Sequence, residues 1–234
     1  MRAIFITGLR QARIEEIPQP DFLAPDSVIL KTKVAGLCGS DLHYFISEVV
    51  SGDPVNYPCL VGHECSAEVV STGPEAKKYK AGELVVVEPS ISCGVCDQCL
   101  AGRLNTCRTI KFLGHPGELP GCFADYFVMP EKNLIPLPPG LSLEEGMLAE
   151  PLSIARHALR LASIENSATV GVLGTGPIGL LLIMLLKSHD FSSIFATDRS
   201  EARVDAALRA GASWAASVEE EDIVSEIGAR QPLG

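Results

Sequence analysis

The feature of this sequence that most constrains its fold is a glycine pattern placed between two predicted strands. An apolar strand is predicted over 168–173. It is followed by Gly174, Gly176 and Gly179, and a helix is predicted over 178–188. A second strand over 193–197 ends at Asp198, which comes 19 residues after the last of these glycines. A strand, a Gly-x-Gly-x-x-Gly turn, a helix and an acidic residue about 20 positions further on are together typical of a dinucleotide-binding βαβ unit.

Each residue of this pattern has a physical role in such a unit. Gly174 allows the tight turn, Gly176 lets the backbone approach a pyrophosphate, and Gly179 lets the helix pack closely on the strand. The amino end of the helix favours the phosphate charge. Asp198 would accept hydrogen bonds from the adenine ribose and repel a 2′-phosphate, which favours NAD. Arg199, directly after it, leaves NADP as an alternative.

The sequence after this unit predicts one more strand and its crossover. A helix over 201–210 is closed by Gly211, and a short strand follows over 214–217. A complete sheet of this doubly wound type has about six strands in two halves. We therefore expect an α/β fold in which the chain holds only the first half of a Rossmann sheet and is truncated after it.

Four closely spaced cysteines predict a second feature, a metal site. Cys93, Cys96, Cys99 and Cys107 are separated by two, two and seven residues. Four thiolates on one loop can wrap a tetrahedral zinc ion and leave no ligand position open. An iron–sulfur cluster also uses four thiolates and is the weaker alternative. We expect a structural zinc that stiffens the loop.

A second set of metal ligands is predicted from two short motifs. Cys38 opens Cys-Gly-Ser-Asp-Leu-His at 38–43, and His63 and Glu64 belong to Gly-His-Glu at 62–64. One thiolate, one imidazole and one carboxylate leave the fourth tetrahedral position free, which is typical of a catalytic zinc. A helix starting at Ser40 and Asp41 would place Ser40 and His43 on the same face. His43 alone would be an ordinary histidine, but beside a metal ligand it is a candidate proton carrier.

The N-terminal part of the chain reads as β-rich, first of all residues 1–34. Strands are expected over 3–6, 28–34, 65–70, 84–87 and 123–128. After a proline-rich turn, Ser142 and Glu145 form a predicted capping box. The helical pattern after Glu150 is the expected connection between two domains.

Composition excludes several classes of function. The net charge is −10, and no run of Lys or Arg indicates nucleic-acid binding. The longest apolar run, 178–186, is too short to span a bilayer, which needs roughly 20 residues. Eight cysteines without a targeting segment indicate metal binding rather than disulfides, so we expect a cytoplasmic protein.

With these motifs in place, the chain resembles the zinc-dependent medium-chain dehydrogenase/reductase family over nearly its whole length. Residues 38–44 and 145–153 are most similar to sorbitol dehydrogenase and other polyol dehydrogenases, and L-threonine dehydrogenase is the alternative. The resemblance implies a GroES-like catalytic domain over 1–152, with a structural-zinc lobe near 90–110, and a partial Rossmann domain over 153–234. It also implies one catalytic and one structural zinc, NAD, an alcohol substrate and a homo-oligomer, either a dimer or a tetramer.

The resemblance also implies roles for individual residues. Cys38, His63 and Glu64 would bind the catalytic zinc, and Glu150 would hold the zinc-bound water or substrate or exchange with Glu64. Ser40 and His43 would carry the alcohol proton, and Tyr44 would line the substrate pocket. The cofactor would contact the glycine loop and Pro177, Ile178, Asp198 and Arg203.

The implied reaction is oxidation of a secondary alcohol to a ketone with hydride transfer to NAD. Two other readings stay open. A zinc-free reductase of the same fold would lack the Cys38, His63 and Glu64 set. An inactive nucleotide- or zinc-binding fragment would fit a chain that ends early.

Overall fold

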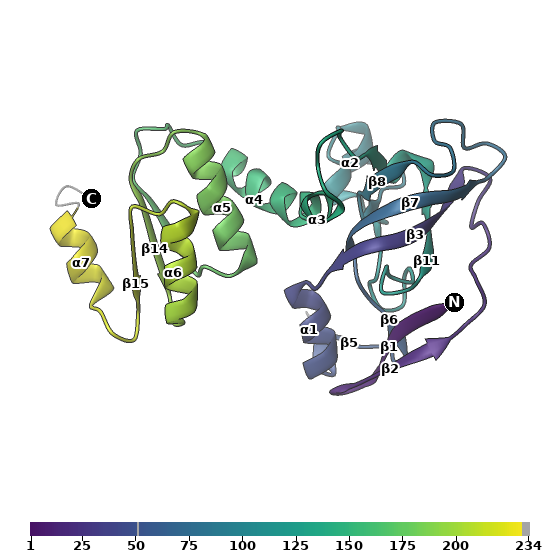
Figure 1. The fold of residues 1–234 in the computed structure, drawn as a ribbon, viewed down its shortest axis with the longest axis horizontal. Helices are drawn as coiled ribbons and strands as arrows, with labels where there is room; N and C mark the ends of the chain where they lie inside the picture. Colours follow the sequence, from purple (N-terminus) through teal and green to yellow (C-terminus); the bar gives the residue numbers. More distant parts are fainter. Residues whose placement is uncertain (51, 231–234) are drawn as a thin grey trace. The chain divides into compact units, whose positions relative to one another are not determined.

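The computed structural model describes residues 1–50 and 52–230 of the chain. It divides into two compact units, Met1–Glu150 and Pro151–Gly234, each with its own hydrophobic core. The boundary falls inside helix α4 (Ala149–Ala162). The two units are described separately below (Figure 1).

The first unit is built from short strands. In chain order they are β1 (Arg2–Gly8), β2 (Gln11–Glu16), β3 (Ser27–Gly36), β4 (Val49–Val50), β5 (Asp53–Pro54), β6 (Cys59–Leu60), β7 (Glu64–Thr72), β8 (Leu84–Val87), β9 (Ser90–Ile91), β10 (Lys111–Phe112), β11 (Tyr126–Pro130) and β12 (Leu134–Pro136). The largest sheet is antiparallel with the strand order β11-β3-β7-β8-β12, and a second sheet has the order β2-β1-β6. The main core lies on the five-stranded sheet and includes Val28, Leu30, Val69, Phe127 and Met129.

Short helices join these strands. They are α1 (Gly39–Ile46), α2 (Asp97–Leu100), the 3-10 turns η1 (Leu104–Thr106) and η2 (Glu131–Asn133), and α3 (Leu143–Met147). The predicted capping box at α3 is confirmed, because Glu145 N–H donates to Ser142 Oγ at 3.1 Å and Ser142 N–H donates to Glu145 Oε2 at 2.8 Å.

The second unit is a three-stranded parallel sheet with helical crossovers. Its elements after α4 are β13 (Val170–Leu173), α5 (Pro177–Ser188), β14 (Ile194–Asp198), α6 (Glu201–Ala210), β15 (Trp214–Ser217) and α7 (Ile223–Arg230). The strand order is β13-β14-β15, and α5 and α6 lie beside these strands in Figure 1. This arrangement confirms the predicted first half of a doubly wound sheet.

The core of the second unit explains the continuous apolar runs in its sequence. Ile183 and Leu186 on α5 pack with Ile194 and Ala196 on β14, because both faces of a parallel sheet are covered by helices. Gly211 closes α6 in a left-handed conformation with φ +115°, as the sequence predicts. In the part of the chain that the structure describes, no helix has the length and apolar character needed to cross a membrane.

Several predicted boundaries differ from the observed ones, and the strands β2, β4, β5, β6, β9, β10 and β12 were not predicted. The strand expected over 123–128 begins at Tyr126, because residues 122–125 instead hydrogen-bond to neighbouring loops and to β1. Helix α1 begins one residue earlier than expected, with Cys38 as its N-cap. Strand β2 escaped prediction because five of its six residues are exposed and show no apolar alternation.

Candidate active site and metal centres

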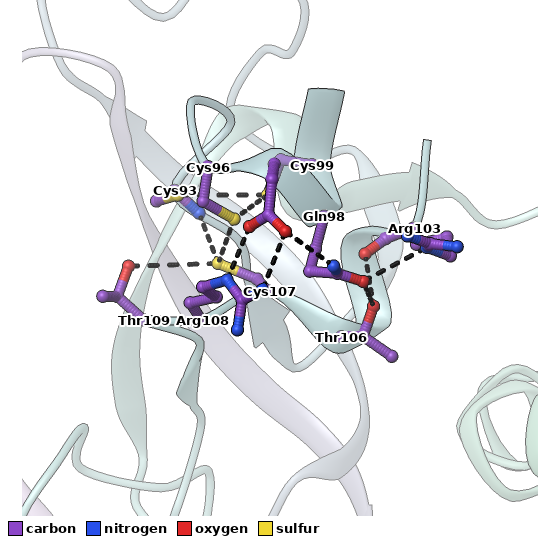
Figure 2. Close-up of polar contacts among 10 residues, drawn as sticks. Cys93, Cys96, Gln98, Cys99, Arg103, Thr106, Cys107, Arg108 and Thr109 are labelled. Carbon is purple, nitrogen blue, oxygen red and sulfur yellow. Dashed lines mark hydrogen bonds and ion pairs between the residues drawn. The ribbon is translucent and has the colours of Figure 1, made fainter. Parts of the chain in front are cut away.

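Cys93, Cys96, Cys99 and Cys107 lie together in one lobe of the first unit (Figure 2). The Sγ atom of Cys96 is 3.6 Å from that of Cys99 and 4.0 Å from that of Cys107, and the Sγ atoms of Cys93 and Cys99 are 3.9 Å apart. Four sulfurs about 2.3 Å from a central ion would be about 3.8 Å from one another, whereas a disulfide bond is about 2.05 Å long. The spacing therefore fits a tetrahedral metal ion.

The local sequence folds the lobe around this cluster. Cys96 caps α2, which places Cys99 one turn later. The guanidinium of Arg108, next to Cys107, binds the carboxylate of Asp97 through two hydrogen bonds of 2.6 and 2.8 Å and lowers the pKa of Asp97 to about 2. This bidentate pair holds the segment that carries Cys107 against the start of α2.

The four thiols also have unequal affinities for protons. Hydrogen bonds from the backbone N–H groups of Val95 and Cys96 lower the pKa of Cys93 to about 6. Burial raises the pKa of Cys99 to about 12. A divalent cation would stabilise all four as thiolates, so the donor set fits the zinc expected here.

Cys38, His63 and Glu64 form the second cluster. One ligand atom from each lies within 4.8 Å of the other two. Glu64 begins β7 and pairs in register with Gly36 at the end of β3, two residues before Cys38. The register of these two strands therefore brings ligands from distant parts of the sequence together. His63 and Glu64 are buried and Cys38 is partly buried, and their sulfur, nitrogen and oxygen donors fit a zinc ion with one open position.

Two glycines make room for this cluster. A Cβ atom on Gly36 would lie 2.6 Å from Met147 Sδ and overlap the carboxylate of Glu64. Gly62 has φ +99°, and a Cβ there would lie 2.7 Å from the ring of Phe123. The glycine in the Gly-His-Glu motif is therefore required by both conformation and packing.

Asp41 is a site residue that the sequence analysis did not identify as functional. Its side chain is 1% exposed, and it accepts hydrogen bonds from the backbone N–H of Cys38 at 3.0 Å and of Gly62 at 3.1 Å. Its Oδ1 atom lies 3.9 Å from Nδ1 of His63. Burial raises the pKa of Asp41, while His63 and the two N–H groups oppose that shift. The carboxylate joins the two segments that carry the predicted ligands.

Phe112 is the second residue that no motif identified. Its ring contacts the imidazole of His63 edge to face, with the ring centres 5.1 Å apart. The contact covers one side of a predicted ligand with an apolar group. An isolated aromatic residue with no neighbouring motif gives no sequence signal for such a position.

Glu150 lies in the electrostatic field of the second cluster. Burial raises its pKa to about 7. A protonated His63 opposes the shift, and the carboxylates of Glu64, Glu88 and Asp41 add to it. Burial also raises the pKa of Glu64. Glu150 can therefore gain or lose a proton near neutral pH.

The three α1 residues predicted to serve this site have different environments. Tyr44 is buried, Ser40 is partly buried and His43 is exposed. Burial and the nearby negative groups of Asp41, Cys59, Glu118 and Cys38 raise the pKa of Tyr44. Among the hydrogen bonds of the described residues, none joins Ser40 to His43, so their proton relay stays a prediction.

The glycine loop of the second unit has the geometry expected of a phosphate cradle. Gly174 has φ +93°, and a Cβ on Gly179 would overlap the carbonyl oxygen of Gly174. A Cβ on Gly176 would meet no atom within 4 Å, so space remains beside its backbone. Pro177 occupies the first turn of α5, and Ile178 is 40% exposed.

Asp198 is held at the carboxyl end of β14 by groups of its own unit. Its Oδ2 atom accepts a hydrogen bond from Thr175 N–H at 2.8 Å, and its Oδ1 atom accepts one from Ser200 N–H at 3.0 Å. Nη1 of Arg203 lies 3.6 Å from Oδ2. Burial would raise the pKa of Asp198, but these groups outweigh it and lower the pKa. The carboxylate is therefore charged and oriented toward the glycine loop.

Known proteins match this sequence and this fold. Residues 24–139 match the family described as alcohol dehydrogenase GroES-like domain. Sorbitol dehydrogenase of Bacillus subtilis is 34% identical over 97% of this chain and 64% of its own. Galactitol-1-phosphate dehydrogenase of Escherichia coli superposes with a TM-score of 0.91 at 29% identity, over 100% of this chain and 66% of its own. For 2R,3R-butanediol dehydrogenase of Bacillus subtilis the TM-score is 0.86 at 33% identity, over 99% and 67% of the two chains.

The chain belongs to the zinc-dependent medium-chain dehydrogenase/reductase family. This family binds zinc and uses NAD or NADP. The chain spans 64% of the length of the sorbitol dehydrogenase that it matches.

Proposed function

We propose that this chain carries the zinc- and alcohol-binding residues of an NAD-linked polyol dehydrogenase, which oxidises a secondary alcohol to a ketone. The convergence of Cys38, His63 and Glu64 carries the proposal, because three donors leave one position for a substrate oxygen. The three relatives above are named for sorbitol, galactitol 1-phosphate and butanediol, and each of these compounds has more than one hydroxyl group.

Each residue of the site has a separate proposed role in this reaction. When bound, zinc polarises the alcohol oxygen and the nicotinamide accepts the hydride. Cys38, His63 and Glu64 hold the metal, and Phe112 keeps water from one side of His63. The Glu150 carboxyl group, which the resemblance places beside the substrate oxygen, is the proposed holder of the zinc-bound water or the alcohol. Ser40 and His43 on α1 are the proposed route by which the alcohol proton reaches solvent.

The cofactor part of the proposal depends on Asp198. Its charged carboxylate would accept hydrogen bonds from the ribose hydroxyls and repel a 2′-phosphate. Arg203, already close to Asp198, partly offsets that repulsion. Titrating the chain with NAD and NADP tests the preference, and tighter binding of NADP would contradict it.

Metal analysis of matched variants tests the proposed function. We expect two zinc ions per wild-type chain and one in Cys38→Ser, which should still bind NAD. Cys93→Ser is the matched control, because it removes a thiolate from the other cluster and should leave the Cys38 cluster loaded. Two zinc ions in Cys38→Ser would refute the catalytic site. Turnover with sorbitol, xylitol and threonine then ranks the substrates.

A further inference from the structure

A compact loop over Phe112–Leu119, here called the 112–119 loop, packs against the segment that carries His63. Its own backbone orders it, since Gly114 N–H donates to Leu119 C=O at 2.9 Å and Glu118 N–H donates to His115 C=O at 3.0 Å. Gly114 has φ +76°, and a Cβ there would lie 2.6 Å from the carbonyl oxygen of Gly62. The loop therefore rests directly on the residue before His63.

This loop places two aromatic rings against the candidate site. The Phe112 ring contacts His63, as described above. The His115 ring meets Tyr44 edge to face, with the ring centres 6.0 Å apart and an interplanar angle of 82°. His115 therefore contacts Tyr44, the residue that the resemblance assigns to the substrate pocket.

One carboxylate contacts both the backbone of Phe112 and the ring of His115. Oε2 of Glu118 accepts a hydrogen bond from Phe112 N–H at 2.6 Å, and Oε1 lies 3.8 Å from Nδ1 of His115. The two nitrogens of an imidazole lie on different edges of the ring, so the edge bearing Nε2 is turned away from Glu118. The side chain of His115 is 47% exposed, which leaves it accessible to a ligand. Neither His115 nor Glu118 has a role in the reaction proposed above.

We propose that His115 binds a substrate hydroxyl distant from the reacting carbon, and that Glu118 is the positioning residue for its ring. The inference rests on the proposed function and deepens it, because it assigns the site to polyols over alcohols with one hydroxyl. A pocket that hydrogen-bonds a substrate hydroxyl discriminates against an analogue that lacks it, since its own polar group is left unpaired.

Binding measurements on the zinc-loaded chain with NAD test this assignment. Calorimetry would compare xylitol with 2-pentanol, which has the same number of carbons and a single secondary hydroxyl. His115→Phe keeps an aromatic ring against Tyr44 and removes both nitrogens. We expect xylitol to bind about tenfold more weakly to this variant, a loss typical of one hydrogen bond, and 2-pentanol to bind as before.

Two further variants separate hydrogen bonding from loop structure. His115→Gln should recover part of the xylitol affinity, because its amide can donate and accept. Glu118→Gln keeps an acceptor for Phe112 N–H but loses the charge that orients His115, so we expect about threefold weaker xylitol binding. Unchanged thermal midpoints would show that the loop is intact in each variant.

The outcomes distinguish this inference from the function on which it rests. Equal losses for xylitol and 2-pentanol in His115→Phe, or no loss for either, would overturn the role of His115 and leave the dehydrogenase proposal standing. A wild-type chain that binds zinc only at the Cys93 cluster would overturn the proposed function, and the inference with it.

Discussion

Asp41 shows how a single buried carboxylate can organise a site without belonging to its predicted ligands. It accepts the N–H groups of Cys38 and Gly62, which are far apart in sequence. In Asp41→Ala these two donors lose their partner in a buried position, and each unpaired donor costs about 1–3 kcal/mol. We expect a lower free energy of unfolding and weaker zinc binding at the Cys38 cluster, measured by denaturant titration and competition with a chelator.

Asp41→Asn is the control for charge. Its amide retains one acceptor oxygen, so one of the two backbone donors stays paired. We expect a loss of stability about half that of Asp41→Ala. If Asp41→Ala matches the wild type in both stability and zinc affinity, the organising role is wrong.

Glu150 should give the metal-free chain a specific dependence on pH. Its pKa is raised from 4.5 to about 7, so the folded chain binds this proton more tightly than the unfolded chain. The stabilisation is fully present below pH 4.5 and is lost as the pH rises through about 7. Glu150→Gln does not lose this stabilisation. As the pH rises from 5 to 8, its thermal midpoint should therefore increase relative to that of the wild type by roughly 2–4 °C.

Zinc is the control for that experiment. A bound dication favours the ionised carboxylate nearby, so the difference between the two proteins should shrink when zinc is added. If the thermal midpoints of the wild type and Glu150→Gln change in parallel from pH 5 to pH 8 without metal, the raised pKa of Glu150 is contradicted.

For single residues, the sequence identifies those that belong to motifs. It misses those whose role depends on a tertiary contact. Cys38, His63 and Glu64 were grouped by ligand type alone, and the structure brings their donor atoms together. Asp41 was assigned to a helix start, and nothing in its neighbours indicates that its side chain reaches Gly62. Phe112 depends on a fold-level contact with His63 that local patterns do not encode.

Among the elements, the turn from β13 into α5 contains two glycines with different requirements. A Cβ on Gly179 would overlap the backbone of Gly174, whereas a Cβ on Gly176 meets no atom within 4 Å. Gly179→Ala should therefore destabilise the second unit by about 1–3 kcal/mol through overpacking. Gly176→Ala should fold normally and weaken NAD binding, because the added methyl occupies the space expected for the pyrophosphate.

Thermal unfolding and NAD titration of both variants check this contrast. The matched pair matters because both changes add the same methyl group within one turn. Equal loss of stability in both would show that the space beside Gly176 is filled in solution.

Helices and strands were predicted correctly where the apolar periodicity agrees with the capping and turn residues at their ends. Helix α6 and its Gly211 stop, strand β15 and the capping box of α3 were all expected from local signals. Strand β2 was not, because it is recognised by its pairing with β1 rather than by its own residues. The start of β11 was also misplaced, since Phe123 hydrogen-bonds outside that strand.

For the whole molecule, two separate cores predict two separable responses to metal removal. The four-cysteine cluster lies only in the first unit, and the sole tryptophan, Trp214, lies only in the second. All four tyrosines lie before residue 127, in the first unit. Treatment with EDTA should lower the tyrosine-monitored unfolding midpoint by roughly 5 °C or more and leave the Trp214 fluorescence midpoint nearly unchanged.

Cys93→Ser should reproduce the tyrosine-monitored shift without a chelator, which excludes a direct effect of EDTA on the protein. A tryptophan midpoint that falls in parallel with the tyrosine midpoint would show that the two units unfold as one cooperative body.

Cys38 is the N-cap of α1, follows the end of β3 by two residues and supplies a predicted ligand. Any reagent that alkylates or oxidises this thiol would therefore act on the backbone as well as on the chemistry. The first turn of α1 should begin to fray, so amide exchange at residues 39–42 would report the chemical state of one sulfur atom.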